Sequence, residues 1–357
     1  MKPYQSILRQ LQDQFSARKG NYLNKIPLYI IFTDVDGTLI RYSPEDELTQ
    51  LFEGDKITRE IVSYAKQENI PLIPVTGRSL QGENGLLTLF SERFKDFLDE
   101  SPFDVAVTAV GTEINIKQQG SEWKLDPLFI QNIEQSVKFN REEIYKELIR
   151  PGGVNDQLIV TFSHIGLCFQ ERDTEENVEK WKNSALDGFI PGDHYNTNMP
   201  GKFKISYYFE GDEDTRISVS LAFRDILNKL GLNKVLIVTS KDITLPQGVI
   251  RYNLDLLAAA KDYAVNYIHR HLEEELQSLD LSNAYLFSIT CGNAGNDLQM
   301  LLDSGNQSMY VSDSTAELKN EIKKEIRLSK VIYESPFTAP KAILDILKNR
   351  DIIREDS

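Results

Sequence analysis

Two aspartates at the end of an apolar run are the clearest chemical signal in this sequence. Residues 28–32 are apolar, and Asp34 and Asp36 follow them closely, with Gly37 and Thr38 directly behind. A short apolar run closed by turn residues predicts a buried strand, whose carboxyl end is where open α/β sheets bind ligands. Two neighbouring carboxylates repel each other, so a divalent cation is the expected compensation. A metal-held aspartate can attack phosphorus and form an aspartyl-phosphate. An exposed Asp-Gly turn is the alternative interpretation.

A second loop and a single lysine add groups that suit a phosphate. Thr76, Gly77 and Arg78 follow another apolar run, at 70–75. A hydroxyl and backbone N–H groups at a helix start can hold a phosphate oxygen, although Thr-Gly is also an ordinary way to begin a helix. Lys261 lies early in an expected helix, where a solvated surface lysine is the plainer explanation.

A late loop at residues 291–297 offers oxygen ligands. It contains Asn293, Asn296 and Asp297 among small residues that permit a tight turn. Carboxylate and amide oxygens of this kind can face a cation. The alternative is a plain turn in which Asn296 or Asp297 caps the following helix.

Composition is that of a globular, acidic protein. The chain has 357 residues, of which 41% are hydrophobic and 26% charged, and its formal net charge is −14. This charge argues against nucleic-acid and anionic-membrane partners, which need a basic face. Only two cysteines, Cys168 and Cys291, and four histidines occur, so a disulfide framework and a histidine-built zinc site have little support. No apolar run approaches a membrane span, and a cytoplasmic location is the expectation.

The order of predicted elements indicates an α/β fold. Strands and helices alternate at both ends of the chain, which predicts a parallel sheet with helices on both faces. The expected strands there are 28–32, 70–75, 105–110, 284–290 and 309–311, and the expected helices are 58–67, 86–98, 254–276, 297–302 and 340–348. The middle is mixed and suggests an inserted α+β domain, with a helix over 123–149, strands at 158–169, 202–209 and 234–239, and a helix over 216–230.

Together the loops resemble the signature of the haloacid dehalogenase superfamily of phosphatases: Asp-x-Asp-Gly-Thr, a Ser/Thr, a Lys and a late acidic motif. The segments 107–114, 203–207, 241–246 and 291–297 also resemble its sucrose-phosphatase branch, which carries a C2-type cap. This resemblance implies a Rossmann-like parallel-sheet core with an inserted α+β (C2-type) cap domain. The expected domains are an N-terminal extension at 1–25, a discontinuous core at 26–117 and 251–357, and a cap at 118–250.

The resemblance also implies a role for each matching residue. Asp34 would be the nucleophile, and Asp36 would protonate the leaving oxygen and then deprotonate water. Thr76 would bind a phosphoryl oxygen and Lys261 would neutralise charge. Mg²⁺ would be held by Asp34, Asp36 through its backbone carbonyl, Asn293 and Asp297. The implied substrate-binding residues are Thr76, Gly77, Arg78, Glu113, Lys202, Lys204 and Asn296, together with the loop at 193–198.

Two departures from the family pattern stand out. The late motif normally opens Gly-Asp, but here it is Gly292-Asn293, and Lys261 is followed by Asp262 instead of Gly. An amide carries no charge, so weaker metal binding is expected unless Asp297 compensates. The predicted function is Mg²⁺-dependent hydrolysis of a small sugar phosphate, similar to sucrose 6-phosphate. A phosphotransferase with the same intermediate and a non-catalytic sugar-phosphate-binding protein are the alternatives.

Overall fold

The structure, a computed structural model, describes most of the chain outside one long central stretch. The described residues are 4–20, 25–41, 48–82, 85–94, 102–118, 122–140, 143–144, 203–244, 250–279, 281, 283–325 and 332–355. They form two compact units. The first consists of Met1–Leu80, Gly85–Phe129 and Lys261–Ser357, and the second of Gln81–Asn84 and Ile130–Ala260.

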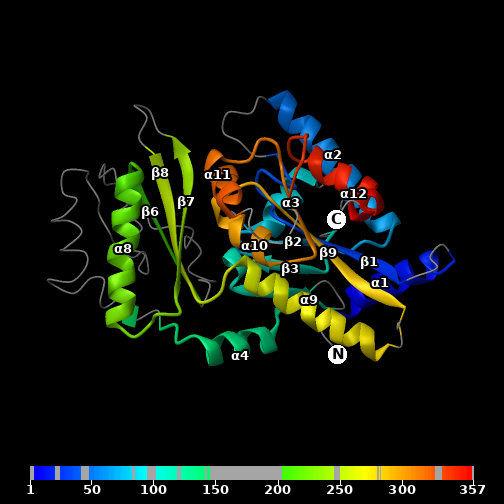
Figure 1. Cartoon of the computed structure of the whole chain (residues 1–357), viewed down its shortest axis with the longest axis horizontal. Helices are drawn as coiled ribbons and strands as arrows, with labels where there is room; N and C mark the ends of the chain where they lie inside the picture. The colour runs from blue at the N-terminus through cyan, green and yellow to red at the C-terminus, as the bar shows by residue number, and fades with distance from the viewer. Residues whose placement is uncertain are drawn as a thin grey trace. The chain divides into compact units, whose positions relative to one another are not determined.

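A five-stranded parallel sheet is the centre of the first unit (Figure 1). Its strand order is β11-β10-β9-β1-β2. The strands are β1 (Ile26–Thr33), β2 (Leu72–Pro74), β9 (Ala284–Gly292), β10 (Gln307–Tyr310) and β11 (Ile332–Glu334). All four pairings are parallel, so the predicted α/β class with a parallel sheet is confirmed.

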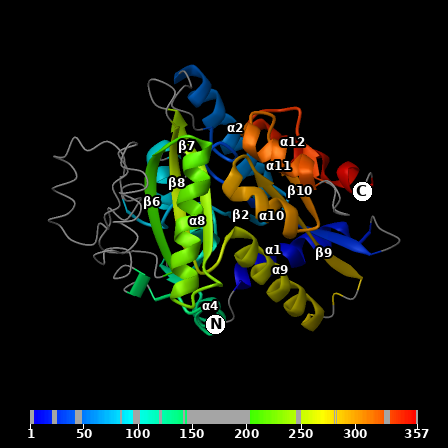
Figure 2. The same ribbon diagram turned by 60° about the vertical axis from the view of Figure 1, so that its left-hand side comes forward.

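Helices cover both faces of this sheet, as predicted (Figures 1 and 2). One face carries the large core cluster and is covered by α2 (Leu48–Gln67), α3 (Leu86–Phe94) and α12 (Lys341–Glu355), with α2 and α12 side by side. The other face is covered by α1 (Gln5–Arg18), α9 (Lys261–Ser278) and α10 (Leu298–Asp303), and α11 (Ala316–Glu325) packs on α10. Because both faces are covered, every residue of β1 is buried.

A small antiparallel sheet extends the first unit beyond β2. It consists of β3 (Val105–Thr108), β4 (Glu113–Lys117) and β5 (Trp123–Leu125), and an isolated parallel bridge joins Val75 to Val107. The short helical turn η1 (Ala109–Gly111) connects β3 to β4. Since β5 pairs with β4, residues up to Phe129 lie in the first unit.

The second unit contains an antiparallel sheet of order β6-β8-β7. Its strands are β6 (Lys204–Gly211), β7 (Leu236–Thr244) and β8 (Ile250–Leu257), and α8 (Glu213–Lys229) packs against them. Buried side chains of both strands and helix form one core cluster, among them Phe209, Phe223 and Leu254. The helix α4 (Pro127–Ser136) begins in the first unit and ends in the second. The assignment of the two units to a catalytic core and a cap stays a prediction.

Three sequence predictions of local structure are wrong. Residues 250–257 are a strand and α9 begins only at Lys261, whereas a helix was expected over 254–276. The alternation of Tyr252, Leu254 and Leu256, all buried in the second core, shows the strand period that the following Leu-Ala-Ala-Ala run disguises. Residues 123–149 are not one helix, because β5 precedes α4. The helix α2 begins at Leu48, whereas it was expected to begin at 58. The expected strand at 158–169 lies outside the described residues.

The N-terminal helix α1 belongs to the first unit and packs on β1. The Gln14 side chain donates to the Tyr29 carbonyl at 2.8 Å and accepts from the Tyr29 N–H at 2.9 Å, so α1 bonds directly to β1. Tyr4 donates its hydroxyl to Asp126 Oδ2 at 2.6 Å. Burial, with help from Asp126, raises the pKa of Tyr4, which keeps this hydroxyl protonated as a donor.

None of the helices in the described part of the chain is long and apolar enough to cross a membrane.

We expect Tyr4→Phe to lower the free energy of unfolding by about 1–3 kcal/mol, because it leaves a buried oxygen of Asp126 without its donor. Tyr310→Phe is the matched control: its hydroxyl donates to Glu334 at 3.0 Å, but Glu334 is exposed. Water can replace that bond, so the control should lose about 1 kcal/mol or less. Chemical denaturation measures both, and equal losses would contradict a special role for the Tyr4 contact.

Candidate active site

The register of the parallel sheet brings the predicted loops to one edge. Thr33 of β1 pairs with Cys291 of β9, and the Asp34 N–H donates to the Cys291 carbonyl at 2.9 Å. On the other side of β1, Thr33 pairs with Pro74, two residues before Thr76. The carboxyl ends of three neighbouring strands therefore carry the loops at 34–38, 76–79 and 291–297, where α/β sheets place their ligands.

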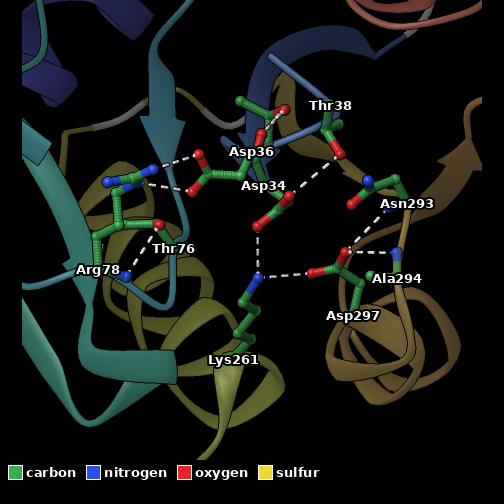
Figure 3. Close-up of polar contacts among 10 residues, drawn as sticks. Asp34, Asp36, Thr38, Thr76, Arg78, Lys261, Asn293, Ala294 and Asp297 are labelled. Carbon is green, nitrogen blue, oxygen red and sulfur yellow. Dashed lines mark hydrogen bonds and ion pairs between the residues drawn. The ribbon is translucent and has the colours of Figure 1, made fainter. Parts of the chain in front are cut away.

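A buried lysine lies between two carboxylates at the centre of this edge (Figure 3). Lys261 Nζ is 2.6 Å from Asp34 Oδ1 and 2.6 Å from Asp297 Oδ1. Lys261 is 1% exposed, Asp34 6% and Asp297 0%. Lys261 is the first residue of α9, so the start of that helix carries the ammonium group to the two loops. The plain interpretation of Lys261 as a solvated surface lysine is excluded.

The charges of this cluster do not balance. Burial raises the pKa of Asp34 to about 7, and Asp297 adds to the shift while Lys261 opposes it. Burial alone would lower the pKa of Lys261, but Asp297 and Asp34 outweigh it and raise that pKa, so the ammonium stays charged. Above that pKa of Asp34 one ammonium faces two carboxylates, and the cluster then favours a further positive charge.

The loop after β1 is shaped around the Asp34 side chain. Thr38 Oγ1 donates to Asp34 Oδ2 at 3.2 Å, and the Leu39 N–H donates to the Asp34 carbonyl at 3.2 Å. Gly37 has a φ of 75°, and a Cβ there would lie 2.2 Å from Asn293 Nδ2. Only glycine satisfies both conditions, which explains its place between Asp36 and Thr38.

The loop after β9 is organised by Asp297. Its Oδ2 accepts from the Asn293 N–H at 2.9 Å and from the Ala294 N–H at 3.1 Å, while its Oδ1 contacts Lys261. The Asn293 side chain packs against Gly37 of the first loop. Asn296, in the turn η4 (Gly295–Asp297), has a buried Oδ1 without a hydrogen-bond partner in the described part of the chain.

The second loop faces Asp36. Arg78 Nε donates to Asp36 Oδ2 and Arg78 Nη2 to Asp36 Oδ1, both at 2.8 Å (Figure 3). Thr76 is fully buried, and its Oγ1 accepts from the Arg78 N–H at 3.1 Å. Gly77 lies between them in the sequence. A Cβ added to Gly77 would be 3.7 Å from a methyl group of Val110, which is an ordinary contact. The sequence suggested Arg78 as a phosphate ligand and gave no sign of its pairing with Asp36.

The remaining predicted residues make contacts of their own or lie outside the described residues. Glu113 begins β4 and accepts from Thr108 Oγ1 at 3.0 Å. Lys204 begins β6 of the second unit, is 4% exposed and lies 3.5 Å from Asp255, a partner that sequence reasoning missed. Lys202 and the loop at 193–198 are outside the described residues.

The cluster partly fits Mg²⁺. Asp34 and Asp297 supply two carboxylates, and the Asn293 amide and the Asp36 carbonyl are further oxygen donors of the kind that Mg²⁺ prefers. The unbalanced negative charge points the same way. Within the described residues, however, no group of three or more His, Cys, Asp and Glu side chains is placed to hold a metal.

We expect Lys261→Met to lower the free energy of unfolding by about 3–5 kcal/mol in the absence of divalent ions, since it leaves two buried carboxylates without their cation. Lys319→Met is the matched control, because Lys319 pairs with Glu334 in a half-exposed bridge. Such a bridge contributes about 0–1 kcal/mol. Chemical denaturation at neutral pH tests both, and a loss from Lys261→Met as small as the control's would contradict the central role of the lysine.

Comparison with known proteins adds one family match. Residues 184–349 match the family model described as sucrose-6F-phosphate phosphohydrolase. No curated protein matches the chain.

Several solved structures are similar at low sequence identity. The haloacid dehalogenase-like hydrolase protein yhjK from Bacillus subtilis is 18% identical, with a TM-score of 0.49, over 94% of this chain and 98% of its own. The C-terminal domain of trehalose-6-phosphate phosphatase from C. albicans is 11% identical, with a TM-score of 0.43, over 100% of both chains. Trehalose-6-phosphate phosphatase from Aspergillus fumigatus is 12% identical, with a TM-score of 0.40, over 98% of both chains.

The family match takes in Lys261 and the loop at 291–297. It therefore confirms, over this part of the chain, the resemblance to the sucrose-phosphatase branch of the haloacid dehalogenase superfamily, and it indicates a phosphatase, that is, a phosphoric monoester hydrolase.

Proposed function

We propose that this protein is a Mg²⁺-dependent phosphatase that hydrolyses a small sugar phosphate, similar to sucrose 6-phosphate, through an aspartyl-phosphate on Asp34. The observation that carries this proposal is the buried contact of Lys261 with Asp34 and Asp297 at the carboxyl edge of the parallel sheet. A structural ion pair alone does not explain two carboxylates around one ammonium at this place. A nucleophile, a cation that steadies it and a second acid do explain it.

In the first step an Asp34 carboxylate oxygen attacks phosphorus as the bond from phosphorus to the sugar oxygen breaks. Asp36 donates a proton to that leaving oxygen, and the free sugar departs. Lys261, already 2.6 Å from Asp34, keeps the nucleophile oriented and offsets negative charge on the transferring group. Thr76, at the neighbouring strand end, supplies a hydroxyl for a phosphoryl oxygen.

In the second step a water oxygen bonds to phosphorus and the bond from phosphorus to Asp34 breaks. Asp36 takes the proton of that water, which returns both aspartates to their starting states and releases phosphate. Thr38 holds the second oxygen of Asp34 at 3.2 Å and so limits its rotation between the two steps.

The residues that would hold Mg²⁺ are Asp34, Asp297, Asn293 and the backbone carbonyl of Asp36. When bound, the ion supplies positive charge that offsets the carboxylates and the phosphoryl oxygens. Asn293 contributes an oxygen but no charge, so this site would bind Mg²⁺ less tightly than one with a third carboxylate.

Lys204 and Glu113 are the proposed sugar-recognition residues within the described part of the chain. The net charge of −14 argues against nucleic acid or an anionic membrane as a partner. It does not forbid a small phosphorylated substrate, because local cations can bind phosphate inside an acidic protein. A cytoplasmic location is part of this proposal.

We expect Asp34→Asn to abolish phosphate release while the protein stays folded, because only the attacking charge is lost. Without divalent ions the variant should be at least as stable as the wild type, since one buried charge is removed beside Asp297. Phosphate release and thermal unfolding measure the two effects. Asp55→Asn is the control and should keep its activity, because Asp55 lies on α2 and not in the loops at 34–38, 76–79 and 291–297.

Residual activity of Asp34→Asn within about tenfold of the wild type would contradict the covalent mechanism. Glycerol phosphate formed by the wild type in added glycerol would instead identify a phosphotransferase with the same intermediate.

We expect Asn293→Asp to lower the Mg²⁺ concentration needed for half-maximal activity, because it restores a charged oxygen ligand. Asp297→Asn should raise it and should also weaken the loop that Asp297 organises. Mg²⁺ titration of the initial rate measures both. Asn266→Asp, an exposed position on α9, adds the same charge outside the site and should leave the titration unchanged. An unchanged or higher requirement in Asn293→Asp would show that Asn293 is not a metal ligand.

A further inference from the structure

The acid–base residue of the proposed reaction is held by an arginine from another loop. Arg78 uses Nε and Nη2 to bond both carboxylate oxygens of Asp36, at 2.8 Å each. This two-point contact is the most directional ion pair that a carboxylate can make. The two residues are 42 positions apart, so the contact joins the loop after β1 to the loop after β2.

The backbone around Arg78 is hydrogen-bonded to the turn η1, whose backbone conformation is unusual. The Arg78 carbonyl accepts from the Ala109 N–H at 2.9 Å, and the Thr76 carbonyl accepts from the Val110 N–H at 3.0 Å. Ala109 and Val110 have φ angles of 50° and 60°. Left-handed backbone is rare for alanine and more so for a β-branched residue, and it persists where surrounding structure imposes it. This turn therefore fixes the backbone position from which the Arg78 side chain extends.

From this geometry, and resting on the proposed function, we infer that Arg78 is a positioning residue: it orients the Asp36 carboxylate for proton transfer and is not a ligand of the substrate phosphate. The Arg78 side chain is 18% exposed, and that of Asp36 is 30% exposed. Asp36 is thus held on one side by Arg78 while it stays open to a reacting group on another. Proton transfer depends steeply on the placement of the donor. Loss of the two hydrogen bonds from Arg78 should therefore slow the reaction by misplacing the Asp36 carboxylate.

The test compares two substrates that differ in their need for an acid. Phenyl phosphate has a poor leaving group and needs protonation, whereas p-nitrophenyl phosphate has a good one and needs little. Arg78→Ala should lower kcat for phenyl phosphate about tenfold more than for p-nitrophenyl phosphate, the pattern of a lost general acid. KM should change little for either substrate, because no phosphate contact is lost.

Two further variants test whether Arg78 acts through Asp36. The double variant Arg78→Ala/Asp36→Asn should be no slower than Asp36→Asn alone, because positioning has no value once the acid is gone. Arg78→Lys keeps the charge but not the fork, so it should stay impaired with phenyl phosphate. It also provides the measurement if Arg78→Ala does not fold.

Arg93→Ala is the matched control, because Arg93 also bonds a carboxylate through Nε and Nη2, that of Asp55, with a similarly buried side chain. It should show no dependence on the leaving group. A rise in KM for both substrates in Arg78→Ala, or losses that add to those of Asp36→Asn, would overturn the inference and make Arg78 a phosphate ligand. If Asp36→Asn itself shows no dependence on the leaving group, the proposed acid–base role fails instead.

Discussion

A buried ammonium between two buried carboxylates is the contact on which the rest of the first unit depends. A charge in this position is costly unless it is paired, and here the pairing needs three segments that lie far apart in the chain. Lys261 comes from the start of α9, Asp34 from the end of β1 and Asp297 from the turn after β9. The parallel register of β1 with β9 places the two acids on one edge, and α9 packs on β9 so that its first residue reaches them.

When both Asp34 and Asp297 are ionised, they carry more negative charge than Lys261 balances. The raised pKa of Asp34 reflects its burial and the proximity of Asp297 more than the relief that Lys261 gives. The hydrogen bonds around the cluster, from Thr38 to Asp34 and from two backbone N–H groups to Asp297, hold the carboxylates in place despite their repulsion. Carboxylates held in this way keep their positions without any ligand, which is the preorganisation that the proposed function requires.

Local sequence predicted the parts of this site that local structure determines. The apolar run before Asp34 and the run before Thr76 ended where the strands end, because a buried strand must be apolar and a loop after it must turn. The start of α9 was misplaced, since an apolar strand followed by alanines has no clear boundary in sequence. The Arg78–Asp36 contact joins two loops that are 42 residues apart in the chain. The Tyr4–Asp126 contact joins the N-terminal region to a residue 122 positions later. No periodicity carries such information, so these contacts required the structure.

The close approach of Gly37 to Asn293 has a consequence for how this sequence can change over time. A Cβ at position 37 would overlap the Asn293 amide, so the loop after β1 and the loop after β9 are in close contact at this point. A shorter residue at 293 would remove this overlap, but it would not free position 37 for a side chain, because the φ of 75° at Gly37 strains any other residue. Position 293 can therefore change while position 37 stays glycine, and the constraint between the two loops runs in one direction only.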